Sequence, residues 1–495
     1  MEKCEIEIKI EEKIEQLYLL SAGYKDQELG LHEMEKGILA ELLNIGLSFL
    51  EKIIKEKTDQ LDAYDIDLGS YKSIGEKPRK YLSIFGSLCM KRQGYWSEQS
   101  GQFYKLDELL KLPPGIYWSY NIQDLVGTSS SETDFRESVR ILNALLGLGL
   151  SGKSSERNTD RLGPYVEQFY NETTYQSEEE GLNFLSGFDG KGVPKIKAAP
   201  AIRNNPKERL ARGEKRGVKQ MATVSVTSSF TAQQRTAESI LIGLMGQEES
   251  EKQGNEVVKK IANKAEKKTG NRLHKNIHRR AFLANQEKAV EYGILELKAR
   301  MTNPKSRFIV PIDAGIGLED QVLTQIEKHG LRDKFDGIVL DIVHGSEYVW
   351  ESGTAIFGEK SKFRRQWVRT TLKKLLEGKV ETVIEELILN RDKTSLSDSK
   401  KKQLDKTITY FSNHKHKMNY PWFLEKGYPI SSAIVESTCK HLVKDRMEHS
   451  GMRWSCQGAQ NMMNLRAVKV NDDMAEFMGF TIQKDRKVNL LKIAA

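Results

Sequence analysis

The spacing of apolar residues predicts helices in the first part of the chain. Residues 1 to about 75 have apolar positions three to four apart, as in "EMEKGILAELLNIGLSFLEKIIKE". "YLSIFGSLCMKRQGYW" then alternates and breaks at glycine, which predicts a short hairpin. Next comes a helix to about Leu146, which meets the turn "GLGLS". A second helix follows, which Ser151 can cap and which Gly163 and Pro164 are expected to end. This is a helix-turn-helix arrangement, although any helical hairpin has the same pattern.

From about residue 181 short apolar strands alternate with helices. "GLNFLSGFDG" ends in Asp189, "RFIVPIDAG" ends in Asp313, and "FDGIVLDIVHG" carries Asp341 and His344. "MATVSVTSSF" alternates as a half-buried strand, whereas "EKAVEYGILELKARM" and "LEDQVLTQIEKHGL" are helical. This order predicts an α/β core with a largely parallel sheet portion. Residues 346–425 lack strand character and predict a helical insertion.

After the insertion, "SSAIVESTCKHLVKDRMEHSGMRW" has apolar residues at helical spacing with Glu436 beside that stripe. Glu436 either pairs with Lys440 four residues on, or belongs to a metal site. The other charges of the helix are cationic and suit a polyanion. These residues alone favour the pair with Lys440, and the metal site is the alternative that the rest of the chain has to support.

The charge of the chain is concentrated in two segments. The 495 residues carry a net charge of +8. Residues 190–219 and residues 252–280 each contain ten Lys or Arg against two Glu, so each segment alone carries +8 and the remainder sums to about −8. Two such basic segments in an otherwise acidic chain predict contact with a nucleic acid backbone.

Other features limit the class of protein. Four cysteines without a CxxC pair argue against a zinc ribbon and a disulfide framework, so a catalytic metal would need oxygen or histidine ligands. No apolar run is long enough for a membrane span, and the acidic N-terminus lacks the apolar stretch of a secretory signal. We therefore expect a protein of the cell interior, without a membrane partner.

The acidic residues suggest a metal site. Asp189 and Asp313 each follow an apolar strand and precede glycine within two residues, where ligand sites of α/β sheets lie. Together with Glu436 they could hold two Mg²⁺ ions, which prefer carboxylate oxygens and substrate phosphate. Such a pair of ions serves phosphoryl transfer. A turn-capping role is the alternative for each Asp.

Several stretches in this order resemble the bacterial insertion-sequence transposases of the ISKra type, which have a DDE catalytic domain. They are "FDGKGVP", "ARGEKRGVKQMATVSV", "LDIVHGSEYVWES", "GYPISSAIVESTCKHLVKDRMEHSGMRW" and "GAQNMMNLRAV". The resemblance covers the C-terminal two thirds well and extends more loosely over "LPPGIYWS". It implies a ribonuclease-H-like core with a helical insertion before the last acidic residue. It also implies cleavage of DNA phosphodiesters at the element ends and attack of the freed 3′-hydroxyl on target DNA.

By this resemblance the catalytic and metal-binding acids are Asp189, Asp313 and Glu436. "DIVH", from Asp341 to His344, matches a motif that follows the second acid in related groups, so Asp313 is preferred and Asp341 is the alternative. Two departures bear on Asp313, because Ala314 separates it from glycine and Pro311 lies within its strand. His344 is expected to position a loop or a neighbouring group, since imidazole is a poor Mg²⁺ ligand; a strand-end His bonded to backbone is the alternative.

Cationic residues near the acids are expected to bind DNA phosphates, which gives affinity without sequence information. Trp454 is expected either to stack on an unpaired base or to lie in the core. The predicted DNA-binding residues are Lys191, Lys195, Arg212, Lys215, Arg216, Lys440, Lys444, Arg446, Arg453 and Trp454.

The sequence as a whole thus predicts a DNA transposase that uses two Mg²⁺ ions, with Mn²⁺ as the alternative ion. Its partners would be double-stranded DNA and further copies of itself, in the cytoplasm with the nucleoid. The expected parts are a helical region 1–75, a DNA-binding region 76–178, a catalytic domain 179–345 with 426–495, and the insertion 346–425. A structure-specific nuclease without strand transfer and a non-catalytic DNA-binding regulator are the alternatives.

Overall fold

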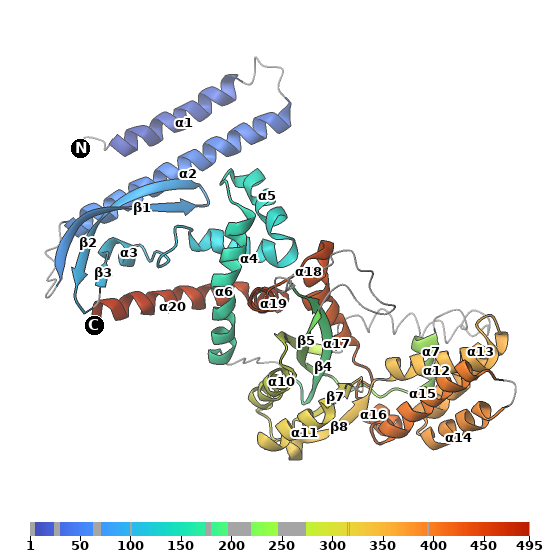
Figure 1. The fold of residues 1–495 in the computed structure, drawn as a ribbon. Helices are drawn as coiled ribbons and strands as arrows, with labels where there is room; N and C mark the ends of the chain where they lie inside the picture. Colours follow the sequence, from blue (N-terminus) through green and yellow to red (C-terminus); the bar gives the residue numbers. More distant parts are fainter. Residues whose placement is uncertain are drawn as a thin grey trace, which may run out of the picture. The chain divides into compact units, whose positions relative to one another are not determined.

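A computed structural model gives the positions of most of the chain. The structure describes residues 5–23, 30–62, 71–99, 101–173, 180–196, 219–245, 274–313, 315, 317–393 and 396–494. The chain forms two compact units (Figure 1). Unit 1 contains residues 1–172 and 464–495, and unit 2 contains residues 173–463. The sequence interpretation kept residues 464–495 with the catalytic region, whereas the structure groups them with the N-terminal part.

Unit 2 is built on a five-stranded mixed sheet. Its strands are β4 (Asn183–Pro194), β5 (Lys219–Phe230), β6 (His274–Leu283), β7 (Arg307–Ile312) and β8 (Phe335–Leu340). The spatial order is β6-β5-β4-β7-β8. The first three strands in sequence pair antiparallel, whereas β7 and β8 run parallel to β4. The predicted α/β class is therefore confirmed, and the predicted parallel portion is formed by three of the five strands, β4, β7 and β8.

Helices cover this sheet because each buries one apolar face on it. On one side, α10 (Gln286–Arg300) and α11 (Leu318–Lys328) pack against strand residues such as Phe188 and Val310. On another side, residues of β5, β7 and β8 join a core with α7 (Ala237–Met245) and the helices that follow β8. The sheet is thus enclosed on both faces, as its near-continuous apolar strands require.

The predicted insertion is helical, but it begins earlier than expected. Its helices are α12 (Ile342–Phe357), α13 (Lys362–Leu376), α14 (Val380–Arg391), α15 (Asp398–His414) and α16 (Tyr420–Glu425). Strand β8 ends at Leu340, so the prediction that Asp341 and His344 lie on a strand is wrong. Asp341 caps α12 by accepting a hydrogen bond from the Val343 amide at 2.7 Å. The apolar run "IVLDIV" is therefore divided at Asp341, with the strand before it and the capped helix after it.

The segment with Glu436 is helical, as predicted, although not uniformly α-helical. It consists of α17 (Ala433–Thr438), a π-helical segment Cys439–Lys444 and α18 (Asp445–Met447). Helix α19 (Cys456–Val470) follows, and the boundary between the units falls within its sequence. Short π-helical segments inside α-helices are frequent at functional sites.

Unit 1 begins with two long helices and a small sheet. Helix α1 (Glu5–Gly23) packs on α2 (Leu31–Asp62), and α2 packs on the antiparallel hairpin of β1 (Lys72–Ser83) and β2 (Gly86–Ser97). A third strand, β3 (Gly101–Phe103), pairs with β2, and the short helix α3 (Lys105–Leu109) follows. The predicted helices and hairpin are confirmed, and the hairpin strands are longer than predicted.

The predicted helix-turn-helix is formed by α5 (Phe135–Leu146) and α6 (Gly152–Glu172), next to α4 (Tyr120–Glu132). Asn143 closes the turn, since its side chain both donates to and accepts from the Leu150 backbone at 2.8 Å. The predicted end of the second helix at Pro164 is wrong. Helix α6 continues because Val166 and Phe169 bury an apolar face beyond the proline.

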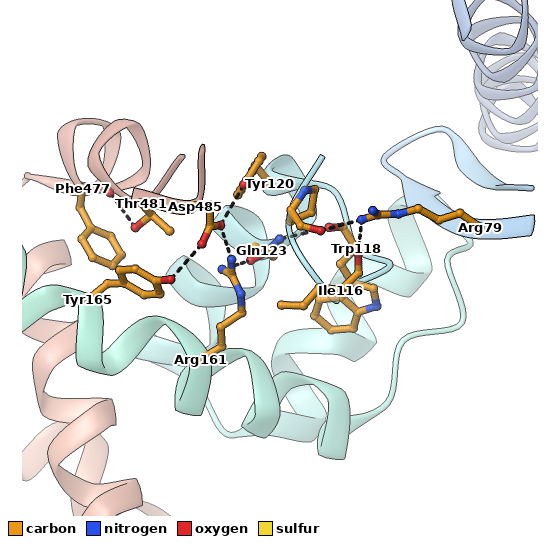
Figure 2. Close-up of polar contacts among 11 residues, drawn as sticks. Arg79, Ile116, Trp118, Tyr120, Gln123, Arg161, Tyr165, Phe477, Thr481 and Asp485 are labelled. Carbon is orange, nitrogen blue, oxygen red and sulfur yellow. Dashed lines mark hydrogen bonds and ion pairs between the residues drawn. The ribbon is translucent and has the colours of Figure 1, made fainter. Parts of the chain in front are cut away.

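The last helix, α20 (Met474–Ala494), completes unit 1 (Figure 1). Its Asp485 is buried and receives hydrogen bonds from the hydroxyls of Tyr120 and Tyr165, each at 2.9 Å. Arg161 forms an ion pair with the same carboxylate and also donates to Gln123 (Figure 2). Side chains from α4, α6 and α20 therefore converge on one buried charge.

No helix in the described ranges is both long and apolar enough to cross a lipid bilayer.

Candidate active site

The register of the sheet brings two of the predicted acids to the same level. Strands β4 and β7 are parallel neighbours, and Leu185 pairs with Ile309. Asp189 and Asp313 each lie four residues further along, so both reach the same height on the same side of the sheet. β4 and β7 are seen next to each other in Figure 1. Two carboxylates of adjacent parallel strands therefore face one site.

The electrostatics of Asp189 show that the two carboxylates interact. Burial raises the pKa of Asp189 above its ordinary value, and the charge of Asp313 raises it further. Hydrogen bonds from the Cys439 thiol and from the Gly190 amide, the latter at 2.6 Å, act in the opposite direction. Like charges held together in this way are costly unless a cation lies between them. The pair therefore forms a site that favours cations.

Asp313 is the more accessible of the two candidates for the second acid. It is half-buried, and its Oδ1 accepts a hydrogen bond from the Gly315 amide at 3.2 Å. Asp341 is 2% exposed, and both its oxygens already accept hydrogen bonds. Oδ1 accepts from the Val343 amide, while Oδ2 accepts from the amide of Ser432, at 3.1 Å, and from its hydroxyl. This geometry favours Asp313 as a metal ligand and a structural role for Asp341.

His344 lies on the first turn of α12, near three carboxylates. Burial lowers the pKa of its imidazole, but the charges of Asp341, Glu347 and Asp313 outweigh burial, so the pKa is raised overall. Its Nδ1 lies 3.3 Å from an oxygen of Glu347. The protonated ring would therefore offset part of the negative charge of the acids.

The helix of Glu436 packs against the strand of Asp189. A Cβ atom added to Gly187 of β4 would lie only 2.3 Å from Cγ2 of Val435, so α17 lies directly on the strand. One helical turn after Glu436, the buried Cys439 contacts Asp189, and burial together with the charge of Asp189 raises the pKa of its thiol. Glu436 itself is exposed.

The structure thus brings Asp189 and Asp313 together and holds Glu436 on the adjacent helix. Within the described ranges, no three His, Cys, Asp or Glu side chains are close enough together to form a metal site. The oxygen donors of the two aspartates fit Mg²⁺, which commonly takes one or two protein carboxylates and completes its shell with water and phosphate. Of the three acids that the sequence predicts for the site, the structure brings Asp189 and Asp313 together.

Cationic side chains lie beside these acids. Lys219 forms an ion pair with Glu448. The hydrogen bond from Lys219 lowers the pKa of this glutamate, and the charges of Lys219, Lys191 and Lys444 lower it further. Lys191 is also close enough to Cys439 to act against the rise in its pKa. Of the predicted DNA-binding residues, Lys191 therefore lies near Cys439, which donates to Asp189, whereas Lys444 lies near Glu448. Lys440 and Arg453 are exposed, and Lys195 donates to the side chain of Gln220 at 3.0 Å.

Two predicted DNA contacts do not fit the structure. Arg446 and Trp454 are 1% and 6% exposed, and the guanidinium lies 4.8 Å from the centre of the indole ring. The indole N–H donates to the Met447 carbonyl at 3.0 Å. Trp454 is therefore a core residue, the alternative that its sequence context left open, and Arg446 packs on it away from solvent. Arg212, Lys215 and Arg216 lie outside the described residues.

Sequence reasoning missed the aromatic residues beside the acids. Tyr410 of α15 stacks on Tyr348 of α12, with ring centres 3.9 Å apart. Burial, the neighbouring Tyr348 and the charges of Asp313 and Asp341 raise the pKa of Tyr410, which keeps its hydroxyl protonated. That buried oxygen has no hydrogen-bond partner among the described residues. No local pattern in the helical insertion signals this approach to the acids.

The search of protein families gave no matching model, and no curated protein matches the sequence.

Proposed function

We propose that the protein is a DNA transposase of the ISKra type, with a ribonuclease-H-like DDE domain in unit 2. A mixed five-stranded sheet with the strand of the first acid at its centre supports this fold. The helical insertion between the strand of Asp313 and the helix of Glu436 agrees with the order that the resemblance implies. The proposal includes double-stranded DNA as substrate, an assembly of several copies on the DNA, and a location in the cytoplasm with the nucleoid.

The observation that carries the proposal is the facing pair Asp189 and Asp313, with Lys191 near Cys439 and Lys444 near Glu448 on the helical stretch that packs on β4. Carboxylates that need a cation, next to lysines that suit phosphate, fit a phosphodiester bound through divalent metal. Two bound Mg²⁺ ions would supply an activated attacking oxygen and stabilise the leaving oxygen.

The roles of the protein groups follow from their positions. Asp189 and Asp313 would hold the metal, while the Cys439 thiol donates to Asp189 and orients it. Glu436 is exposed one turn before Cys439 and would supply a further metal ligand when DNA is bound. The lysines hold the strand that carries the scissile phosphate.

A strand-transfer assay tests the proposal. The substrate is a labelled duplex with the sequence that flanks the gene, ending in a 3′-hydroxyl, together with a supercoiled plasmid and Mg²⁺. We expect the wild type to join the duplex to the plasmid. Asp189→Asn, Asp313→Asn and Glu436→Gln should each lower joining by about 100-fold or more, the scale of losing one group that stabilises transition-state charge. Asp445→Asn, an exposed acid on the same helical stretch, is the matched control.

The outcomes separate the alternatives. Plasmid nicking without joining would favour a structure-specific nuclease, and binding without cleavage would favour a regulator. Asp341→Asn tests the two candidates for the second acid. If Asp341 is structural, the new amide would face the two donors of Ser432, and the substitution should cost about 1–3 kcal/mol of stability. If Asp341→Asn were stable but inactive while Asp313→Asn joined DNA normally, Asp341 would be the second acid.

A further inference from the structure

Helix α2 exposes a row of large apolar side chains. We call this row the apolar stripe. Leu31 is 72% exposed and Leu42 is 50% exposed, and the other three members lie between 36% and 47%. The apolar stripe consists of Leu31, Ile38, Leu42, Phe49 and Ile53. At 100° per residue these five positions fall within an arc of about 60°, so they form one face of the helix.

The other two faces of α2 are already covered within unit 1. Towards α1, Lys52 pairs with Glu7 at 2.7 Å, and Lys13 donates to Ser48 at 2.8 Å. Towards the hairpin, Leu47, Leu50 and Ile54 pack on a core cluster that includes residues of β2. The apolar stripe is therefore not needed to hold α2 in its own unit.

The exposed large hydrophobic side chains of the described residues are concentrated on α1 and α2. Ten of the 23 exposed large hydrophobic side chains in the described residues lie on α1 and α2, which together span 51 residues. Single exposed apolar residues are normal on a protein surface, but contiguous ones mark interaction sites. This excess indicates a contact surface along the helical hairpin.

The spacing of the apolar stripe is self-complementary. Its members are separated by seven, four, seven and four residues, an 11-residue repeat that keeps the row nearly parallel to the helix axis. The inner spacing from Ile38 through Leu42 and Phe49 to Ile53 is four, seven, four, which reads the same in both directions. In a twofold antiparallel pair, Ile38 would meet Ile53 of a second copy, and Leu42 would meet its Phe49.

The chain itself offers no better occupant for the apolar stripe. From Leu31 to Ile53 the stripe is about 33 Å long. The segments on either side of α2, residues 24–29 and 63–70, could span at most about 21 and 28 Å. The longer segments 197–218 and 246–273 are dominated by charged and polar residues. A second copy, by contrast, brings an identical apolar row.

We propose that α2 is a dimerisation helix, which pairs antiparallel with α2 of a second copy through the apolar stripe. This inference does not depend on the proposed function, because it concerns the free protein without DNA.

Light scattering on a size-exclusion column tests it with the full chain at about 10 μM. We expect the wild type to have twice the mass of the 56.4 kDa chain, and the double variant Leu42→Glu with Phe49→Glu to have the mass of one chain. Both positions are exposed, so the variant should keep its circular dichroism spectrum. Leu389→Glu is the matched control, since Leu389 is 69% exposed on α14, and it should remain dimeric.

Two results would overturn the proposal: a wild type with the mass of one chain, or a double variant that stays dimeric. Disulfide crosslinking tests the orientation. A mixture of Ile38→Cys and Ile53→Cys chains should crosslink above the wild-type background, whereas either variant alone should not. Crosslinking of each variant alone would indicate a parallel pair instead.

Discussion

Four aspartates of this protein perform different tasks because their surroundings differ. Asp341 uses both oxygens to hold α12 and Ser432, and Asp485 is neutralised by Arg161. Asp189 faces a second carboxylate and favours a cation. Asp473 has no cationic partner among the interactions that set its pKa. A buried or half-buried carboxylate is stable only when its charge is balanced or removed, so each site predicts a different response to pH.

The contribution of Asp473 to stability depends on pH. Burial, together with the charges of Glu476 and Asp472, raises its pKa to about 6, despite the hydrogen bond from the Tyr170 hydroxyl at 2.7 Å. Between about pH 4 and pH 6, the folded protein therefore holds a proton on Asp473 that the unfolded chain has released. The contribution of this group to the free energy of unfolding accordingly falls as the pH rises from about 4 to about 6.

We expect Asp473→Asn to remove this contribution. Urea unfolding of the wild type and the variant at several pH values measures the difference between their midpoints. That difference should grow in favour of the variant from pH 4 to pH 6.5. A difference that is independent of pH would show that the carboxyl of Asp473 is not perturbed.

At the scale of elements, the contact between β4 and α17 links the sheet to the helix of Glu436. Gly187→Ala would place a Cβ atom 2.3 Å from Val435, so the helix must move away from the strand. Overpacking of this kind typically costs about 1–3 kcal/mol. We expect Gly187→Ala to be destabilised in urea unfolding and, under the proposed function, to lose strand joining because Glu436 is displaced.

Two further variants make this prediction specific. Gly243→Ala adds a methyl group in open space on α7 and should be neutral or stabilising by up to about 1 kcal/mol. Val435→Ala makes room for the new methyl group, so the double variant should be more stable than the sum of the single effects predicts. Strict additivity would show that the two residues do not meet.

The sequence predicted most elements in which the apolar residues recur at a single clear spacing, either that of a helix or that of a strand. Strands β4, β5 and β7 and helices α10 and α11 were found, because their apolar residues follow a clear pattern. The start of α12 was missed because buried residues lie on both sides of Asp341, and an apolar run does not distinguish strand from helix. The continuation of α6 beyond Pro164 was missed because distant packing compensates for the lost hydrogen bond.

The candidate site was predictable only in part for a related reason. The ends of apolar runs identified Asp189 and Asp313, and the register of β4 and β7 brings them together. The prediction that the strand ends at Asp189 is wrong, because β4 continues to Pro194 in its pairing with β5. The burial of Arg446 and Trp454 and the approach of Tyr410 depend on tertiary packing, which no local spacing reports.

At the scale of the whole molecule, the last helix belongs to the first unit. Helix α20 supplies Phe477 and Met478 to a cluster with Leu162 and Val166 of α6, and Asp485 to the buried network with Arg161. These contacts join residues about 300 positions apart, so local periodicity could not predict them. They also mean that α4 and α6 depend on α20 for stability.

Removal of α20 should therefore destabilise unit 1 and leave unit 2 folded. A chain ending at Asp472 exposes the apolar face of α6 and leaves Arg161 without its carboxylate, and loss of one partner of a buried ion pair alone costs about 3–5 kcal/mol. Hydrogen exchange measures this by region: amides of α4 and α6 should lose protection, whereas those of β4 and β7 should keep it. Asp485→Asn should reproduce part of the loss in the same amides, while the exposed Glu98→Gln in unit 1 should not. Equal loss of protection in β4 would show that the two units do not fold separately.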